Sequence, residues 1–120
     1  VKANFKDGET KGKGIKYWEN GNVKEKGTFS ISGLDGKGIK YFENGKIQEK
    51  GIFSYSYFKK GTRYFEDGQY VVGTFLNGDP HGKCTHYWAN KKKRSVGVWE
   101  RNRKNGLFMI YHENGTRIYL

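Results

Sequence analysis

The sequence predicts an all-β fold: an elongated, single-layer antiparallel meander of about five tandem β-hairpins. Three observations predict this fold class. A unit of about two dozen residues recurs along the chain, turn-forming residue pairs recur within that unit, and polar and apolar residues alternate between the turns. We therefore expect residues 1–120 to form a single repeat array.

The repeat is clearest in its first two copies, which open at Phe5 and Phe29. Both copies contain the stretches Gly-Lys-Gly-Ile-Lys-Tyr and Glu-Asn-Gly. Three further copies, with more drift, open at Phe53, Phe75 and Trp99. The order of opening aromatic, glycine, tyrosine and turn recurs in all of them, and chance does not reproduce such an order five times.

Each copy is expected to supply a pair of strands. Ile39 and Tyr41 alternate with Lys40 and Phe42, and a period of two residues indicates a β-strand. The alternation predicts one hairpin from residues 37–43 and 46–53, and the next from residues 60–66 and 69–75.

The turns are expected to come from pairs of Asn or Asp with Gly. Asn20-Gly21, Asn44-Gly45 and Asp67-Gly68 favour type I′ turns, in which both central residues have a positive φ. Between successive hairpins we expect polar loops, at Ser30–Asp35 and at Leu76–His81.

The strand period also assigns side chains to the two faces of the sheet. We expect one face to carry Ile15, Tyr17, Ile39 and Tyr41, and the other to carry the aromatic residues that follow the tyrosines, namely Trp18, Phe42, Phe65 and Trp88. A glycine stands two residues before each later opening aromatic, at Gly27, Gly51, Gly73 and Gly97. A missing side chain there lets a ring from the neighbouring strand lie over the backbone.

The repeat resembles the MORN repeat, whose unit runs Tyr-x-Gly-x-Phe-x-x-Gly-x-x-x-Gly-x-Gly. Tyr70, Gly73, Phe75, Gly78 and Gly82 follow that order, with one extra residue after Tyr70. Cys84 stands where the last Gly belongs, and Glu25 and Glu49 replace the leading Tyr in other copies. The amino-acid sequence from Tyr41 to Gly51 is most similar to a bacterial variant of the repeat, found in predicted antitoxin proteins of the YwqK type.

The resemblance covers the chain from Phe5 to Leu120 and implies successive hairpins in one twisted sheet. It also implies a non-catalytic role in protein–protein contact, scaffolding or dimerisation. Acidic-lipid binding has been proposed for the family and receives less weight here.

The net charge of +11 is concentrated in the last third of the chain, where nine Lys and Arg stand against two Asp and Glu in residues 83–120. Such a field favours acidic partners, although a solvated surface explains most of the excess. The candidate patch for an anionic partner, expected in loops clustered at one rim, consists of Lys91, Lys92, Lys93, Arg94, Arg101, Arg103 and Lys104.

No catalytic residue and no cofactor is predicted. Cys84 and His86 would share a strand face, with His81 and His112 as further soft ligands, but a structural zinc site needs four ligands, usually from two separated pairs. We therefore expect no metal site. The lone cysteine excludes an internal disulfide and favours a cytoplasmic location, while the start at Val1 leaves export open.

The first functional hypothesis is a binding scaffold that grips another protein or peptide on its sheet face. The expected groove is formed by one tyrosine from each copy: Tyr17, Tyr41, Tyr64, Tyr87 and Tyr111. Open strands at residues 1–5 and 116–120 make a homodimer a further option. The alternatives are a bacterial antitoxin or immunity protein, and binding of anionic lipid or nucleic acid through the basic C-terminal third.

Overall fold

The structure, a computed structural model, describes residues 2–3 and 11–118 and forms two compact units, Val1–Lys59 and Lys60–Leu120. The described residues are strands and turns, and none of them belongs to a helix with the length and apolar character of a membrane-spanning segment. The predicted fold class, an all-β antiparallel meander of tandem hairpins, is confirmed within each unit. Phe5, the predicted start of the first copy, lies outside the described residues.

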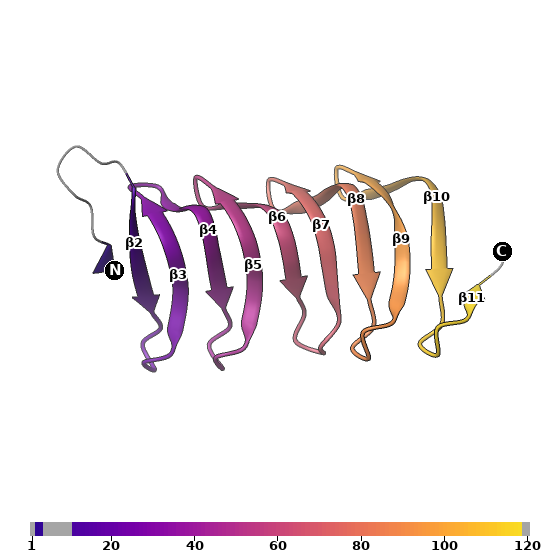
Figure 1. Cartoon of the computed structure of the whole chain (residues 1–120), viewed down its shortest axis with the longest axis horizontal. Coiled ribbons are helices and arrows are strands. Elements are labelled where there is room, and N and C mark those ends of the chain that lie inside the picture. Colours follow the sequence, from indigo (N-terminus) through magenta and orange to yellow (C-terminus); the bar gives the residue numbers. More distant parts are fainter. Residues whose placement is uncertain (1, 4–10, 119–120) are drawn as a thin grey trace. The chain divides into compact units, whose positions relative to one another are not determined.

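The first unit is a meander whose strands follow the order of the sequence (Figure 1). Its strands are β1 (Lys2–Ala3), β2 (Gly12–Tyr17), β3 (Val23–Ser30), β4 (Gly33–Tyr41) and β5 (Ile47–Ser54). Each strand pairs antiparallel with the next, so β3 lies between β2 and β4.

The second unit repeats this arrangement (Figure 1). It contains most of β6 (Tyr57–Tyr64), followed by β7 (Tyr70–Leu76), β8 (Asp79–Tyr87), β9 (Lys93–Glu100), β10 (Arg103–Tyr111) and β11 (Arg117–Ile118). The pairing of β6 with β7 has no shift in register, unlike the equivalent pairing of β4 with β5. The β4–β5 pairing contains a β-bulge, and the β6–β7 pairing does not. The absence of this bulge residue accounts for part of the shortening of the third copy.

The prediction of type I′ turns at the Asn-Gly pairs is wrong. Of the pair Asn44-Gly45, only Gly45 has a positive φ, of 90°. The Phe42 amide donates to Lys46 O at 2.8 Å and the Gly45 amide donates to Phe42 O at 3.0 Å, which closes a three-residue loop with a left-handed glycine at its end. Asn44 instead accepts, at its Oδ1, a hydrogen bond from the Lys46 amide at 2.9 Å.

Tight two-residue turns lie at the opposite ends of the strands, where polar loops were expected. Both Asn77 and Gly78 have positive φ, as do Arg101 and Asn102, which is the geometry of a type I′ turn. The loops predicted at Ser30–Asp35 and Leu76–His81 are wrong, because β4 already begins at Gly33 and β8 at Asp79. Shifts in register of β4 and β8 absorb the extra residues within the strands.

The core lies on one side of each unit, which we call the inner face. In the first unit it is built from Phe29, Leu34, Phe53 and Phe58, and in the second from Val71, Phe75 and Cys84. Phe53 and Phe58 contact each other with ring centroids 5.1 Å apart. The centre of this face has directly opposed glycines, since Gly38 pairs with both Gly27 and Gly51.

The prediction that a ring lies over the glycines before the opening aromatics holds at Gly97, where a Cβ would lie 2.6 Å from Cδ1 of the Phe108 ring. It is wrong at Gly27 and Gly73, where a Cβ would meet the backbone of the neighbouring strand and, at Gly73, the Cys84 thiol. These glycines permit close approach of neighbouring strands.

Candidate functional site

The opposite side of the first unit, its outer face, carries lysines and isoleucines in register. Ile15 pairs with Lys26, Lys26 with Ile39, and Ile39 with Lys50, so the two residue types alternate across four strands. We call this surface the lysine–isoleucine face; it consists of Lys13, Ile15, Tyr17, Lys26, Lys37, Ile39, Lys50 and Ile52.

Two shallow hollows lie side by side on the lysine–isoleucine face. One, of about 660 Å³, is lined by residues that include Ile15 and Tyr17; the other, of about 370 Å³, is lined by residues that include Ile39 and Ile52. Both contain Lys26, Gly27 and Lys37, so they are continuous. None of the described residues that line them is acidic. The surface thus interleaves apolar and positively charged side chains.

Of the predicted groove tyrosines in the first unit, Tyr17 lines the larger hollow and is 52% exposed. Ile15 and Tyr17 share the outer face, as predicted. Tyr41 is half-buried, and its carbonyl accepts a hydrogen bond of 3.2 Å from the Trp18 indole. Trp18 therefore ties one copy of the repeat to the next.

In the second unit, Tyr64 and Tyr87 are brought together by a residue that sequence reasoning missed. Tyr70 lies between them, with ring centroids 5.6 Å from Tyr64 and 4.7 Å from Tyr87, the latter nearly parallel. Burial raises the pKa of Tyr70, and Tyr87 and Tyr64 raise it further. The shortened third copy was the available signal, because it places Tyr70 directly opposite Tyr64. Tyr111 lines a different hollow, together with Trp88 and Ile118.

The candidate anionic patch does not gather at one rim, and that prediction is wrong. Lys91 and Lys92 lie in the turn before β9, whereas Arg101 lies in the turn after it. Arg103 and Lys104 follow at the start of β10, and Lys93 and Arg94 open β9. The backbones of these residues therefore form two groups at opposite ends of β9, although the side chains of Arg94 and Lys104 line the same pocket.

Several of these cations have partners of their own. Lys92 Nζ donates to Asn114 O at 3.1 Å. The Arg94 guanidinium lies 4.6 Å from the centre of the Trp88 ring and donates to the Gln69 side chain. Lys104 Nζ lies 5.2 Å from the centre of the Phe108 ring.

The soft ligands considered for a metal do not converge. Cys84 is buried, and its thiol donates to Thr74 O at 3.4 Å. Burial raises the pKa of this thiol, although the backbone of Thr74 and of His81 opposes the rise. His81 Nδ1 accepts a hydrogen bond of 3.3 Å from the Arg101 amide. Within residues 2–3 and 11–118, no three His, Cys, Asp or Glu side chains are grouped as a metal site.

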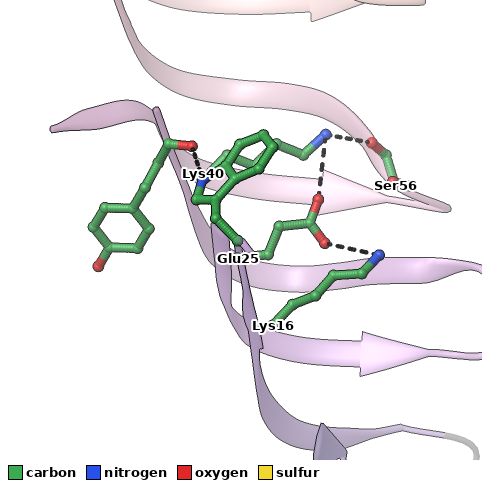
Figure 2. Close-up of polar contacts among 6 residues, drawn as sticks. Lys16, Glu25, Lys40 and Ser56 are labelled. Atoms are coloured by element: carbon green, nitrogen blue, oxygen red, sulfur yellow. Dashed lines mark hydrogen bonds and ion pairs between the residues drawn. The ribbon is translucent and has the colours of Figure 1, made fainter. Parts of the chain in front are cut away.

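On the inner face of the first unit, beside the opposed glycines, Glu25 forms ion pairs with lysines on both neighbouring strands. Figure 2 shows the Glu25 carboxylate between two lysines: Lys16 Nζ lies 4.0 Å from one oxygen and Lys40 Nζ lies 3.9 Å from the other. Lys40 also donates to Ser56 O at 3.4 Å. Because Glu25 is only 9% exposed, its charge depends on these lysines for compensation.

A pocket of about 430 Å³ lies in the second unit, lined by residues that include Gln69, His86, Arg94, Trp99 and Lys104. The rings of His86 and Trp99 are in contact, with centroids 5.4 Å apart. His86 Nδ1 and Trp99 Nε1 are both shielded from solvent without a hydrogen-bond partner. Partial burial lowers the pKa of His86, and the positive charges of Arg94 and Lys104 lower it further.

The fold and its two distinct faces define a tandem β-hairpin repeat protein. Family models match three segments that together make up more than half of the chain: the MORN repeat variant at residues 10–30 and 34–55, and the MORN repeat at residues 72–93. The chain belongs to the MORN-repeat family. MORN repeats are commonly protein- or membrane-binding modules and are generally not enzymes. A search of curated proteins found no match, and the closer likeness to YwqK-type antitoxins stays a prediction.

Proposed function

We propose that this chain is a non-catalytic protein-binding module whose lysine–isoleucine face takes an acidic segment of another protein that also carries apolar side chains. The observation that carries the proposal is the alternation of Ile15, Lys26, Ile39 and Lys50 across neighbouring strands. Apolar contacts with the isoleucines supply the buried area, and the lysines favour partners of opposite charge.

The lysines also favour an acidic protein segment over a purely apolar segment. Lys26, Lys37 and Lys50 are exposed, and no pairing with a carboxylate is seen for them among the described residues. Lysines of one charge interleaved with isoleucines select the charge of the partner and speed association.

Capture from a native extract, followed by cross-linking, tests this proposal. We expect a captured protein whose acidic segment is cross-linked to Lys26 or Lys37. Ile52→Asp, which places a carboxylate on the face, is expected to abolish capture. Ile31→Asp is the matched control, because Ile31 is 99% exposed in a turn away from the face.

Charge reversal supplies a second comparison. Lys37→Glu on the face is expected to weaken binding, whereas Lys46→Glu, in an exposed turn, is expected to leave it unchanged. Equal capture by Ile52→Asp and Ile31→Asp, or cross-links that avoid the face, would contradict the proposal.

A further inference from the structure

The pocket between β8 and β9 of the second unit contains two polar nitrogens that lack partners. The indole N–H of Trp99 is only a donor, and the Nδ1 atom of a neutral His86 can be one. Polar groups shielded from solvent are satisfied in the great majority of cases, so an unsatisfied pair in one pocket requires an explanation. The Trp99 indole and, in its Nδ1–H tautomer, His86 can each donate to one acceptor.

The equivalent place in the first unit shows what can fill it. There, Glu25 pairs in register with Lys16 on β2 and with Lys40 on β4. The same register in the second unit places Ser95 opposite His86 on β8 and opposite Ile110 on β10. Ser95 therefore occupies the position of Glu25, and the carboxylate seen in Figure 2 has no counterpart there.

Positive charge nevertheless remains around the pocket. Arg94 and Lys104 both line it, and both act on His86 electrostatically. The pocket also contains Asp67, but its two carboxylate oxygens already accept hydrogen bonds of 3.0 Å from the backbone and side-chain nitrogens of Gln69. Two cations and two unpartnered nitrogens thus line a pocket next to Ser95, which pairs with His86 and replaces Glu25, and Asp67 is the one carboxylate among the described lining residues.

We propose that this pocket, formed by His86, Arg94, Trp99 and Lys104, binds a carboxylate group that takes the place filled by Glu25 in the first unit. Arg94 and Lys104 supply the positive charge, and Trp99 and His86 supply neutral donors. Both nitrogens are shielded as the rings stand, so binding through them requires the ring concerned to rotate. A volume of about 430 Å³ admits one acidic side chain or a small carboxylic acid.

The indole resonances of the three tryptophans provide the readout. Acetate, inorganic phosphate and a short glutamate-containing peptide are titrated into the protein, with sodium chloride at matched ionic strength as the blank. We expect a saturable shift of the Trp99 indole N–H with acetate or the peptide. Trp18 is the internal control, because its indole already donates to Tyr41 O at 3.2 Å, whereas the Trp88 ring contacts Arg94 and reports on that side chain.

The acetate and peptide arms separate the two sources of the carboxylate. Saturation by acetate assigns the pocket to free carboxylic acids as well as to side chains, and saturation by the peptide alone assigns it to an acidic segment of a partner. Saturation by phosphate alone overturns the proposal. It is also overturned if the Trp99 resonance does not move, or if all three indoles move together with ionic strength.

Surface variants test the same site without altering the core. Lys104→Gln and Arg94→Gln are each expected to weaken carboxylate binding by about tenfold or more, because each removes a charged partner. Lys83→Gln removes the same charge from an exposed position that does not line the pocket, and we expect it to bind as the wild type does. Unchanged binding in both pocket variants would overturn the proposal.

Ser95→Glu supplies the missing carboxylate from within the chain. We expect this variant to abolish the acetate or peptide response, to shift the Trp99 indole resonance without ligand, and to raise the pKa of His86. If Ser95→Glu folds and still binds the carboxylate as tightly as the wild type does, Ser95 is not the equivalent of Glu25 and the proposal fails.

Discussion

At the scale of single residues, Gly97 is a position where packing leaves no room for a side chain. The three atoms nearest to a Cβ at this position all belong to the Phe108 ring, at 2.6–2.7 Å. Gly97→Ala is therefore expected to lower the free energy of unfolding by about 1–3 kcal/mol, the usual cost of overpacking. Denaturation in urea measures the change.

A second substitution tests whether the Phe108 ring is the cause. In a Phe108→Leu background, the ring is gone and Gly97→Ala should cost less than in the wild type. The difference between the two costs is the coupling energy of the pair. Equal costs in both backgrounds would place the clash elsewhere.

The His86 imidazole makes stability depend on pH. Its pKa is lowered in the folded chain by partial burial and by Arg94 and Lys104, so the unfolded chain binds a proton more readily. Stability is then at its full value above about pH 6.5, the ordinary histidine value, and falls as the pH decreases below it. In His86→Gln this loss should be smaller, which thermal unfolding across that range would measure; an unchanged pH profile would contradict the argument.

At the scale of elements, the sequence predicted the hairpins well and their turns badly. Asn44-Gly45 is compatible with a type I′ turn or with the end of a three-residue loop. The bond from the Phe42 amide to Lys46 O decides for the loop. The tight turn Arg101-Asn102 lacks the glycine of the favoured pairs, and the pairing of β9 with β10 on either side holds it in place.

One turn departs from its equivalents in a way that can be corrected. Lys91 has a φ of 72° at the position that Gly21, Gly45, Gly68 and Gly115 occupy in the other copies. A left-handed residue with a side chain costs about 1–2 kcal/mol, and glycine loses part of that gain to chain entropy. We expect Lys91→Gly to raise the free energy of unfolding by about 0.5–1 kcal/mol. Lys92→Gly, whose φ is not positive, should produce no gain.

The candidate sites were predictable only in part, because the pairing register of neighbouring strands decides which residues meet. Ile15, Tyr17 and Ile39 were placed on one face from the strand period alone, and the structure agrees. Tyr70 was missed because its position depends on a bulge that the third copy lacks. His86 and Trp99 were not connected because the pairing register of β8 and β9, not sequence distance, brings their rings together.

At the scale of the whole molecule, the net charge of +11 favours acidic partners. The distribution of that charge decides how many cations one partner can contact at the same time. The turn residues Lys91 and Lys92 before β9 and Arg101 after it are separated by the eight residues of that strand, or roughly 25 Å at about 3.3 Å per residue. This distance exceeds the Debye length of about 8 Å at physiological ionic strength, so the two turns act independently, whereas Arg94 and Lys104 line one pocket.

Binding of single-stranded nucleic acid should therefore depend only moderately on salt. A strand held by one group neutralises about three or four phosphates, which gives a slope of log affinity against log salt of about −2 to −3. A single patch of seven cations would give about −5. Fluorescence anisotropy of a labelled oligonucleotide between about 50 and 200 mM salt distinguishes the two values. A slope near −5 that Arg101→Gln and Lys92→Gln each reduce would show that both groups hold one strand together, contrary to the independence argued from their separation.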